Sequence, residues 1–488
     1  MSISGLSRAD LFIERAFIGG EWASARQGRT INVDNPASGE VLGTVPDCDE
    51  LDTRAAIDAA AEAFPAWRNR TAGERAALLE RWHGLILENL ADLARIMTAE
   101  QGKPLAEAEG EIRYAATFVK WFAEEGRRIC GHDVRPPEAN RRIFVTKEPV
   151  GVSAAITPWN FPAAMITRKC APALAAGCPI VVKPSDLTPY TALALGKLAE
   201  EAGFPSGVIS IVTGMPQAIG AEITRNPKVR KLSFTGSTRI GALLMRQCSD
   251  TIKKLSLELG GNSPLIVFDD ADLDLAVAST MASKFRNAGQ TCVCANRILV
   301  QDGVHDEFAA RLGKAVQQLT VGPGDAPGVT TGPLINAAGV EKVRAHLDDA
   351  LANGASAFAT VESSLDPNRF VAPVVLTGAN SKMRLASEET FGPVAPLFRF
   401  RHEEGALEMA NSTPFGLASY FFTEDLHRAF RVAERLEAGI VALNTGGVSM
   451  EMAPFGGVKQ SGLGREGGRE GIEEYLETKA FHVGGLKL

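Results

Sequence analysis

Residues 285–297, FRNAGQTCVCANR, place Cys292 and Cys294 one residue apart, with no histidine or acidic side chain nearby. A C-x-C pair supplies at most two thiolate ligands, so without a second Cys or His pair the stretch does not predict zinc. A permanent disulfide would close a very tight loop in a reducing compartment and is not expected, although a reversible redox link stays open. Cys292 ends a Gly-Gln-Thr turn from which a thiol can face a cleft. A nucleophile whose partners lie elsewhere in the chain is therefore one hypothesis, and a buried, inert thiol is the other.

The remaining cysteines and the histidines carry no comparable signal. The seven cysteines are an odd number spread through the chain, which indicates reduced thiols rather than a disulfide framework. Because free cysteine is usually buried, we predict buried, inert thiols at Cys130, Cys170, Cys178 and Cys248. No pair of histidines has metal-ligand spacing. We therefore expect no bound metal.

Three other short stretches hold groups that a nucleophile would need. LELGG (257–261) puts Glu258 at the end of an expected strand, beside two glycines that leave room for a ligand. PWNFP (158–162) holds Asn160 between two prolines that stiffen the backbone, although Asn160 could also cap a helix. FTGSTRIG (234–241) places Gly236 and Ser237 at a strand-to-helix turn, where free N–H groups receive a pyrophosphate. Each stretch alone is weak evidence.

The elements that must position these residues follow an α/β pattern. From about residue 150, short apolar runs such as PIVVKPS alternate with helical segments, which predicts a parallel sheet with a ligand crevice at the carboxyl ends of its strands. In the helix expected after PWNFP, Pro172 should start a new helix or kink the existing one. A second alternation of about 210 residues begins near residue 263. Residues 141–150 and 474–486 are predicted to be isolated strands that pair with each other or with another subunit.

Bulk composition excludes several classes of protein. The net charge of −7 and pI near 5.7, without basic runs, argue against nucleic-acid and membrane-surface partners. No segment has the ~20 apolar residues of a membrane span, and Asp10 and Glu14 interrupt any signal peptide. We therefore expect a cytoplasmic protein with small-molecule partners.

Seven stretches in fixed order resemble the aldehyde dehydrogenase superfamily over nearly the whole chain: PWNFP, VVKPSDLTP, FTGSTRIG, LELGG, FRNAGQTCVCANR, EETFGP and PFGGVKQSGLGREG. Within it, the chain is most similar to bacterial succinate-semialdehyde dehydrogenases. The resemblance implies a Rossmann-like NAD(P)-binding domain (1–133 and 150–258), an α/β catalytic domain (259–470) and a small β oligomerisation element (134–149 and 471–488). It also implies a homodimer or homotetramer.

The same resemblance implies the catalytic roles. Cys292 is expected to attack the aldehyde, and the Asn160 amide with the N–H of Cys292 to stabilise the oxyanion. Loss of hydride to the cofactor leaves a thioester, and Glu258 is expected to activate the water that hydrolyses it. No metal takes part. The resemblance assigns the following residues to cofactor binding: Trp159, Asn160, Lys183, Ser185, Asp186, Gly236, Ser237, Leu259, Glu389 and Phe391. Relatives that use NADP commonly have a small hydroxyl residue at position 186, so the Asp186 carboxylate, which repels a 2′-phosphate, predicts a preference for NAD.

The expected substrate is succinate semialdehyde, whose distal carboxylate matches Arg168, Arg286 and Ser449 in the subfamily, because arginine grips a carboxylate with two donors. Sequence spacing does not show whether the two arginines converge, so structural pairing is the alternative for both. Cys294 matches relatives in which a C-x-C pair oxidises reversibly. Glutarate semialdehyde or another ω-semialdehyde acid is the nearest rival substrate. A catalytically silent nucleotide-binding protein is a further alternative, disfavoured because Cys292, Glu258 and Asn160 are all present. A CoA-acylating enzyme is another, disfavoured by the presence of Glu258.

Overall fold

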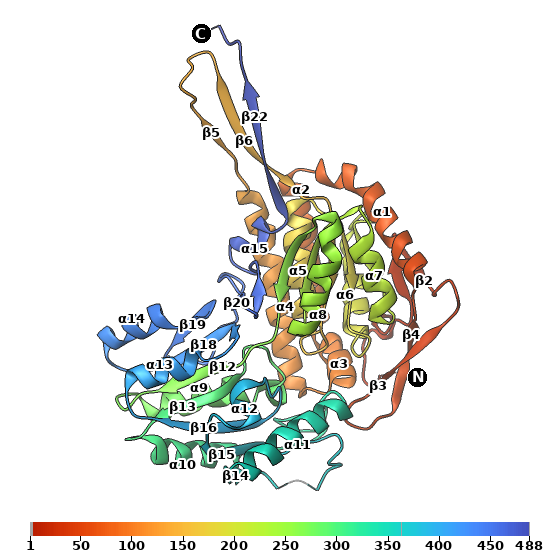
Figure 1. The fold of residues 1–488 in the computed structure, drawn as a ribbon. Coiled ribbons are helices and arrows are strands. Elements are labelled where there is room, and N and C mark those ends of the chain that lie inside the picture. Colours follow the sequence, from red (N-terminus) through yellow and green to blue (C-terminus); the bar gives the residue numbers. More distant parts are fainter. Residues whose placement is uncertain (1–2, 363, 488) are drawn as a thin grey trace.

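The computed structural model describes residues 3–362 and 364–487 (Figure 1). Its largest sheet has eight strands in the order β2-β1-β9-β8-β7-β10-β11-β21, with five central parallel strands and antiparallel neighbours at both edges. These strands are β1 (Ala16–Ile18), β2 (Glu21–Ala23), β7 (Val152–Ile156), β8 (Ile180–Lys183), β9 (Ile209–Ile211), β10 (Val229–Thr235), β11 (Lys254–Glu258) and β21 (Gly462–Leu463).

Helices cover both faces of this sheet, because its central strands are apolar on both sides. Ala155, Ile180 and Val182 pack in the core formed with α2 to α6, whereas Ala154 and Val181 pack in the core formed with α1, α7 and α8. The helices are α1 (Glu50–Arg68), α2 (Ala72–Glu88), α3 (Leu90–Gln101), α4 (Leu105–Glu125), α5 (Ala164–Ala176), α6 (Tyr190–Ala202), α7 (Pro216–Arg225) and α8 (Thr238–Cys248). Helix α5 runs through Pro172 as a single element. The predicted alternative of a new helix starting there is therefore wrong.

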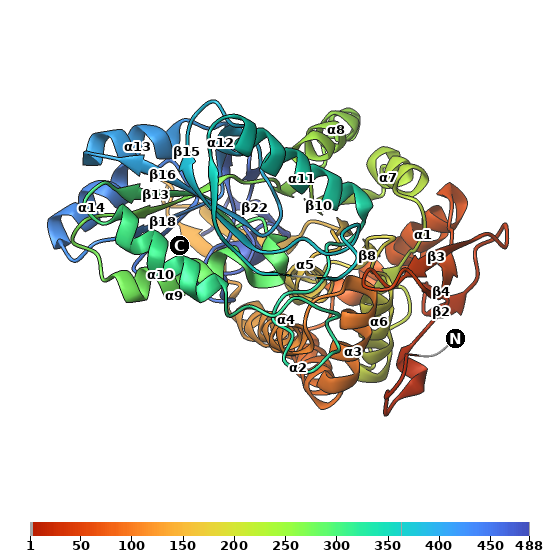
Figure 2. The same ribbon diagram turned by 90° about the horizontal axis from the view of Figure 1, so that it is seen from below.

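The second sheet has seven strands in the order β14-β15-β16-β13-β12-β18-β19, all parallel to their neighbours except β14. They are β12 (Ser263–Val267), β13 (Ala295–Gln301), β14 (Ser356–Thr360), β15 (Val374–Ala379), β16 (Val394–Phe400), β18 (Ala418–Phe422) and β19 (Ile440–Leu443). The helices of this half are α9 (Leu273–Lys284), α10 (His305–Val316), α11 (Ala337–Ala352), α12 (Arg384–Ser387), α13 (Glu403–Asn411) and α14 (Leu426–Arg435). Figure 2 shows this half beside the first.

Three small sheets complete the fold. Strands β5 (His132–Val134), β6 (Arg142–Pro149) and β22 (Leu476–Val483) form an arm that projects from the body, as Figure 1 shows. The others are the pairs β3 (Thr30–Asp34) with β4 (Val41–Pro46) and β17 (Phe415–Gly416) with β20 (Val458–Lys459). The short helix α15 (Glu470–Glu473) precedes β22.

The predicted α/β class, with two sheets of mainly parallel strands and a small β element, is confirmed. The two segments predicted as isolated strands pair with each other as β6 and β22. Strand β21 lies within the range predicted for the catalytic domain but pairs with β11 of the first sheet. The division into functional domains stays a prediction.

Candidate active site

The chain order of the first sheet reverses at one point. From β7, the chain adds β8 and β9 on one side and β10 and β11 on the other. Ligands bind in such sheets at the carboxyl ends of the strands beside the reversal. The loop after β7 carries Trp159 and Asn160, β10 leads into Gly236 and Ser237, and β11 ends at Glu258. The strand topology thus gathers motif residues that lie far apart in sequence.

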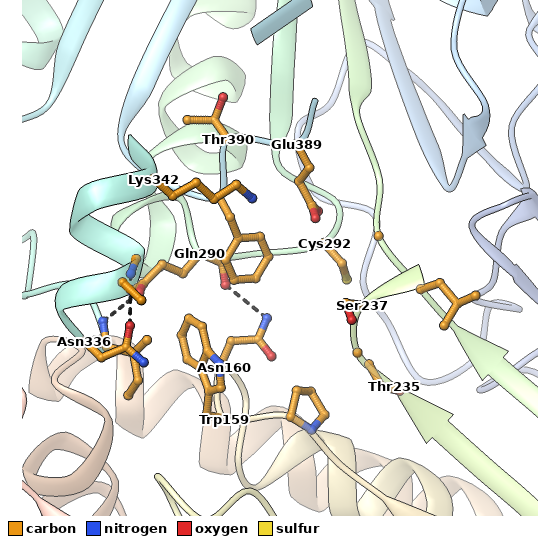
Figure 3. Close-up of a pocket in the computed structure, with 18 of the residues that line it drawn as sticks. Trp159, Asn160, Thr235, Ser237, Gln290, Cys292, Asn336, Lys342, Glu389 and Thr390 are labelled. Atoms are coloured by element: carbon orange, nitrogen blue, oxygen red, sulfur yellow. Dashed lines mark hydrogen bonds between the residues drawn. The ribbon is translucent and has the colours of Figure 1, made fainter. Parts of the chain in front are cut away.

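These strand ends open into a cavity of about 380 Å³ that the second half of the molecule closes (Figure 3). Eight of the predicted site residues line it, namely Trp159, Asn160, Gly236, Ser237, Leu259, Cys292, Glu389 and Phe391. The remaining predicted residues, Arg168, Lys183, Ser185, Asp186, Glu258, Arg286, Cys294 and Ser449, do not line this cavity.

The loop that presents Cys292 has an unusual backbone. It begins with the short 3₁₀ segment η4 (Arg286–Gly289), in which Asn287 and Ala288 are left-handed with φ of 51° and 53°. Gly289 continues at φ 75°, and a Cβ there would lie 2.3 Å from the carbonyl oxygen of Gly392, so only glycine fits. The half-buried Cys292 follows and points into the cavity.

Cys292 is a free thiol whose environment favours the protonated form. Burial raises its pKa to about 12, although Arg168 opposes the rise. The thiolate is the nucleophilic form. Burial thus opposes formation of the thiolate, and the thiol proton has to leave when the sulfur attacks a substrate.

Asn160 is buried, with its side-chain amide beside Cys292 (Figure 3). Its Nδ2 donates to the carbonyl oxygen of Gln290 at 3.0 Å, and its Oδ1 has no hydrogen-bond partner among the described residues. Because an amide nitrogen carries two hydrogens, one remains for a further acceptor. Asn160 does not cap a helix, since the N-cap of α5 is Ala163.

Glu258 is only 3% exposed, and neither of its oxygens has a hydrogen-bond partner among the described residues. Burial raises its pKa well above the ordinary value, and the Glu466 carboxylate raises it further, whereas Lys169 and Arg168 oppose the shift. A Cβ on Gly456 would lie 2.8 Å from Glu258 Oε1, so this glycine leaves room for the carboxylate. An unpaired carboxyl group with a raised pKa is suited to exchange protons near neutral pH.

Glu389, Phe391 and Trp159 also line the cavity. The Gly261 N–H donates to Glu389 Oε1 at 3.2 Å, and a Cβ on Gly260 would lie 3.2 Å from Glu389 Oε2. Burial raises the pKa of Glu389 to about 7. The Phe391 and Trp159 rings meet edge to face at 5.6 Å, and Phe391 is held at φ 58°. The two glycines thus bring backbone close to a carboxylate that faces the cavity.

Lys183 and Asp186 form a pair outside the cavity lining. Lys183, the last residue of β8, is buried, and its Nζ lies 3.4 Å from Asp186 Oδ1. Burial lowers the pKa of Lys183, whereas Asp186 opposes that shift. The Ser185 hydroxyl accepts a hydrogen bond from the Leu187 N–H at 3.2 Å and stabilises the turn between them. These residues follow β8, which neighbours the reversal point.

The two arginines predicted to hold a carboxylate lie in different environments. Arg168 on α5 is 2% exposed, donates to the Tyr114 hydroxyl at 2.6 Å and lies 3.7 Å from Glu466 Oε2. Its Nε and Nη1 have no hydrogen-bond partner among the described residues. Arg286 is exposed, with its guanidinium 5.1 Å from the centre of the Phe161 ring. Both positive charges lower the pKa of Cys292, so both lie within electrostatic reach of the sulfur.

The other predicted residues differ in burial. Ser449 is half-buried in the loop between β19 and β20. Cys294 is fully buried, and its sulfur accepts a hydrogen bond from Lys284 Nζ at 3.3 Å. Cys130 is exposed, so the prediction of a buried thiol there is wrong, because the chain leaves the body at this point to enter the arm. The predictions for Cys170, Cys178 and Cys248 are confirmed, since all three are buried.

The motifs did not reveal every residue that lines the cavity. Gln290 lies within the stretch 285–297, but the sequence did not predict where its side chain lies. Its Nε2 donates a hydrogen bond to the Asn287 carbonyl oxygen, and its Oε1 accepts one from the Ile335 N–H. Asn336 and Lys342 come from the start of α11, a segment without a motif. No sequence signal marked α11 as part of the site.

Residues 3–362 and 364–487 contain no cluster of three or more His, Cys, Asp or Glu that could hold a metal ion. Within the same ranges, every helix is too short or too polar to cross a bilayer. The cytoplasmic location stays a prediction.

Residues 22–481 match the sequence model of the aldehyde dehydrogenase family. The chain belongs to the aldehyde dehydrogenase family. The predicted resemblance and enzyme class are thereby confirmed. The chain is 58% identical to the crystal structure of a succinate-semialdehyde dehydrogenase from Burkholderia pseudomallei, with a TM-score of 0.97 over 99% of this chain and 100% of that one.

Three curated relatives differ in their named substrates. The chain is 57% identical to the succinate-semialdehyde dehydrogenase [NADP(+)] GabD of Escherichia coli K12, covering 98% of this chain and 99% of the relative. It is 58% identical to a glutarate-semialdehyde dehydrogenase of Pseudomonas putida KT2440, with 97% and 98% covered. It is 56% identical to a 3-sulfolactaldehyde dehydrogenase of Pseudomonas putida, with 99% of each covered. Identity alone therefore does not select one substrate.

Proposed function

We propose that this aldehyde dehydrogenase oxidises succinate semialdehyde to succinate, with NAD(P) as the electron acceptor. The observation that carries the proposal is the pair Arg168 and Arg286, which both act on the Cys292 sulfur electrostatically. Within the described residues, Arg168 Nε and Nη1 have no hydrogen-bond partner, although Nη1 lies 3.7 Å from Glu466 Oε2, and Arg286 is exposed. A semialdehyde acid has its carboxylate at the end opposite the carbonyl, where such groups would bind it. The substrates named for the three relatives all carry an acidic group.

In the proposed reaction, the Cys292 thiol gives up its proton to water as its sulfur attacks the aldehyde carbon and forms a thiohemiacetal. The negative charge on the carbonyl oxygen is stabilised by the free Nδ2 hydrogen of Asn160 and by the backbone N–H of Cys292. Losing one such donor typically costs ~10²- to 10³-fold in rate. Oxidation of the thiohemiacetal leaves a thioester on the sulfur.

Glu258 is proposed to activate water for hydrolysis of this thioester. In its ionised form it accepts a proton from the water, which then attacks the thioester carbonyl and releases succinate and the Cys292 thiol. Its raised pKa makes it a better base than an ordinary glutamate. A base that activates water also favours hydrolysis of the thioester over transfer of the acyl group to CoA.

The cavity and the neighbouring strand ends carry groups suited to a dinucleotide, which would supply the hydride acceptor when bound. Helix α8 begins next to the cavity with Ser237 as its N-cap. The Ile240 N–H donates to the Ser237 hydroxyl at 3.4 Å, so the N–H groups of Thr238 and Arg239 are the ones proposed to receive a pyrophosphate. The Glu389 carboxylate is placed to accept hydrogen bonds from ribose hydroxyls, and Trp159 and Phe391 supply apolar walls. We propose a preference for NAD, because the Asp186 carboxylate beside Lys183 would repel a 2′-phosphate.

The arm is proposed to mediate association into a homodimer or homotetramer. Phe144 and Phe481 form a stacked cross-strand pair on β6 and β22, and both rings are exposed. Strands β5 and β22 are edges whose backbone groups are free to pair with another chain. We also propose the division of the chain into cofactor domain, catalytic domain and arm at the boundaries predicted from sequence.

A panel of aldehydes tests the proposed function. Production of reduced cofactor is followed at 340 nm with succinate semialdehyde, glutarate semialdehyde and uncharged butanal, each with NAD and NADP. We expect the highest kcat/KM for succinate semialdehyde and no turnover by Cys292→Ser. Glutarate semialdehyde is the second candidate, because a relative of equal similarity acts on it and one methylene changes binding by only ~1–3 kcal/mol. Equal kcat/KM for butanal and the two acids would refute the proposal.

A further inference from the structure

Asn287 is 2% exposed and is outside the cavity lining, yet its polar groups connect several segments. Its Nδ2 donates to the Asn160 carbonyl oxygen at 3.0 Å and to the Gln290 carbonyl oxygen at 3.4 Å. Its Oδ1 accepts from Gln101 Nε2 at 3.0 Å, and its N–H donates to Glu107 Oε2 at 2.8 Å. Asn287 therefore joins helices α3 and α4 to both loops of the candidate site.

The Gln290 carbonyl oxygen is the centre of this network. It accepts from Asn160 Nδ2 at 3.0 Å as well as from Asn287 Nδ2, and Figure 3 shows the first of these bonds beside Cys292. The Gln290 N–H in turn donates to the Asn287 carbonyl oxygen at 3.0 Å. The direction of the Asn160 amide thus depends on a carbonyl group that Asn287 holds in place.

We propose that Asn287 is a positioning residue for the oxyanion site, which fixes the Asn160 loop relative to the loop that carries Cys292. The Asn160 loop follows β7 of the first sheet, whereas the Cys292 loop lies between α9 and β13 of the second half. Asn287 links the two directly. The inference rests on the roles of Cys292 and Asn160 in the proposed function.

The backbone of Asn287 allows a clean substitution. At φ 51°, asparagine and glycine are the residues that fit with little strain. Asn287→Gly therefore removes the amide and keeps the backbone conformation. Ala288→Gly is the matched control, because Ala288 is buried beside it at φ 53° and loses only a methyl group. Asn287→Asp keeps the shape but turns an oxygen towards the carbonyl oxygens of Asn160 and Gln290.

Two reactions of Cys292 separate positioning from general structural damage. The single-turnover rate of hydride transfer depends on the oxyanion site, whereas alkylation by iodoacetamide displaces iodide from carbon and forms no oxyanion. For Asn287→Gly we expect hydride transfer to fall about 10- to 100-fold, since small misplacements of catalytic groups cost this much. We expect the alkylation rate and the KM for NAD to change less than about twofold. Ala288→Gly should leave all three unchanged.

A double-mutant cycle with Asn160→Ala completes the test. If Asn287 acts through Asn160, Asn287→Gly has little further effect once the amide is gone. Additive losses, a parallel fall in alkylation and hydride transfer, or an unchanged rate in Asn287→Gly would each overturn the inference. If Asn160→Ala alone leaves hydride transfer unchanged, the oxyanion assignment fails as well. Should Asn287→Gly not fold, Asn287→Asp is measured with the same readouts and the same expected separation.

Discussion

Replacing Arg286 by methionine removes the guanidinium that lies over the Phe161 ring, and with it the charge, but keeps most of the apolar stem. Hydrogen bonds to charged groups contribute ~1.5–3 kcal/mol. Arg286 is exposed, so water competes for its guanidinium and the lower end of this range applies. A loss of about 1.5 kcal/mol corresponds to about a tenfold fall in kcat/KM. We expect this fall for succinate semialdehyde, mainly as a higher KM, because the carboxylate is bound equally before and during the reaction.

The assay compares succinate semialdehyde with butanal, an uncharged aldehyde of the same length, at saturating cofactor. Butanal lacks the carboxylate, and the exposed Arg286 lowers the pKa of Cys292 less than Arg168 does, so the kcat/KM for butanal should change less than about twofold in Arg286→Met. Arg286→Lys is the matched control and should give an intermediate value, since a lysine keeps the charge but loses the planar pair of donors. Equal losses for the two aldehydes would show that Arg286 affects the nucleophile rather than the carboxylate.

Arg168 is less suited to this experiment, although it is the more buried arginine. Its removal leaves Glu466 with one cation fewer and removes a positive charge that opposes the pKa rises of Glu258 and Cys292. Arg168→Met should therefore impair both aldehydes. Only the excess loss with succinate semialdehyde would report carboxylate binding.

Three further predictions concern proton transfer, cofactor choice and redox chemistry. Because its pKa is raised, Glu258 ionises at a higher pH than an ordinary glutamate, so kcat should increase with pH through that pKa. Glu258→Gln should abolish this increase. An unchanged pH profile in the variant would assign the increase to another group. Asp186→Ser should shift the ratio of kcat/KM for NAD and NADP about tenfold towards NADP; a tenfold preference of the wild type for NADP would contradict the proposed role of Asp186. Peroxide should inactivate the wild type by forming a disulfide between Cys292 and Cys294, and dithiothreitol should reverse the inactivation. Cys294→Ala should not show this reversible inactivation. Equal reversible inactivation of both proteins would show that Cys294 is not the partner of Cys292.

The sequence predicted those parts of the site that local patterns determine. Apolar runs followed by glycine-containing turns placed Gly236, Ser237 and Glu258 at strand ends, and the structure has them there. The polar turn before Cys292 left a cleft-facing thiol and a buried thiol as two hypotheses, and in the structure Cys292 lines the cavity. Parallel strands bring their carboxyl ends to one edge of a sheet, so such predictions need no knowledge of long-range contacts.

Contacts between distant segments could not be predicted in the same way. The buried Lys169–Glu466 ion pair joins residues 297 positions apart, and neither residue lies at a spacing that indicates the other. Asn287 lies inside a recognised motif, but its partners Gln101 and Glu107 follow no pattern. Charge pairing and hydrogen bonding at such distances depend on how the two halves of the molecule pack.

The Lys169–Glu466 pair makes Glu258, rather than its acidic neighbour Glu466, the better candidate for the proposed base. Burial opposes ionisation of Glu466, but Lys169 and Arg168 outweigh it and hold the pKa of Glu466 below the ordinary value. The charge on Glu466 then adds to burial in raising the pKa of Glu258. The pKa of Glu258 is thus raised and that of Glu466 is lowered, although both carboxyl groups lie in one buried cluster. Such a difference in pKa is typical of sites in which one of two carboxyl groups exchanges protons. Pairing with Lys169 thus favours the ionised form of Glu466, and Glu258 is the carboxyl group that suits the proposed role of base.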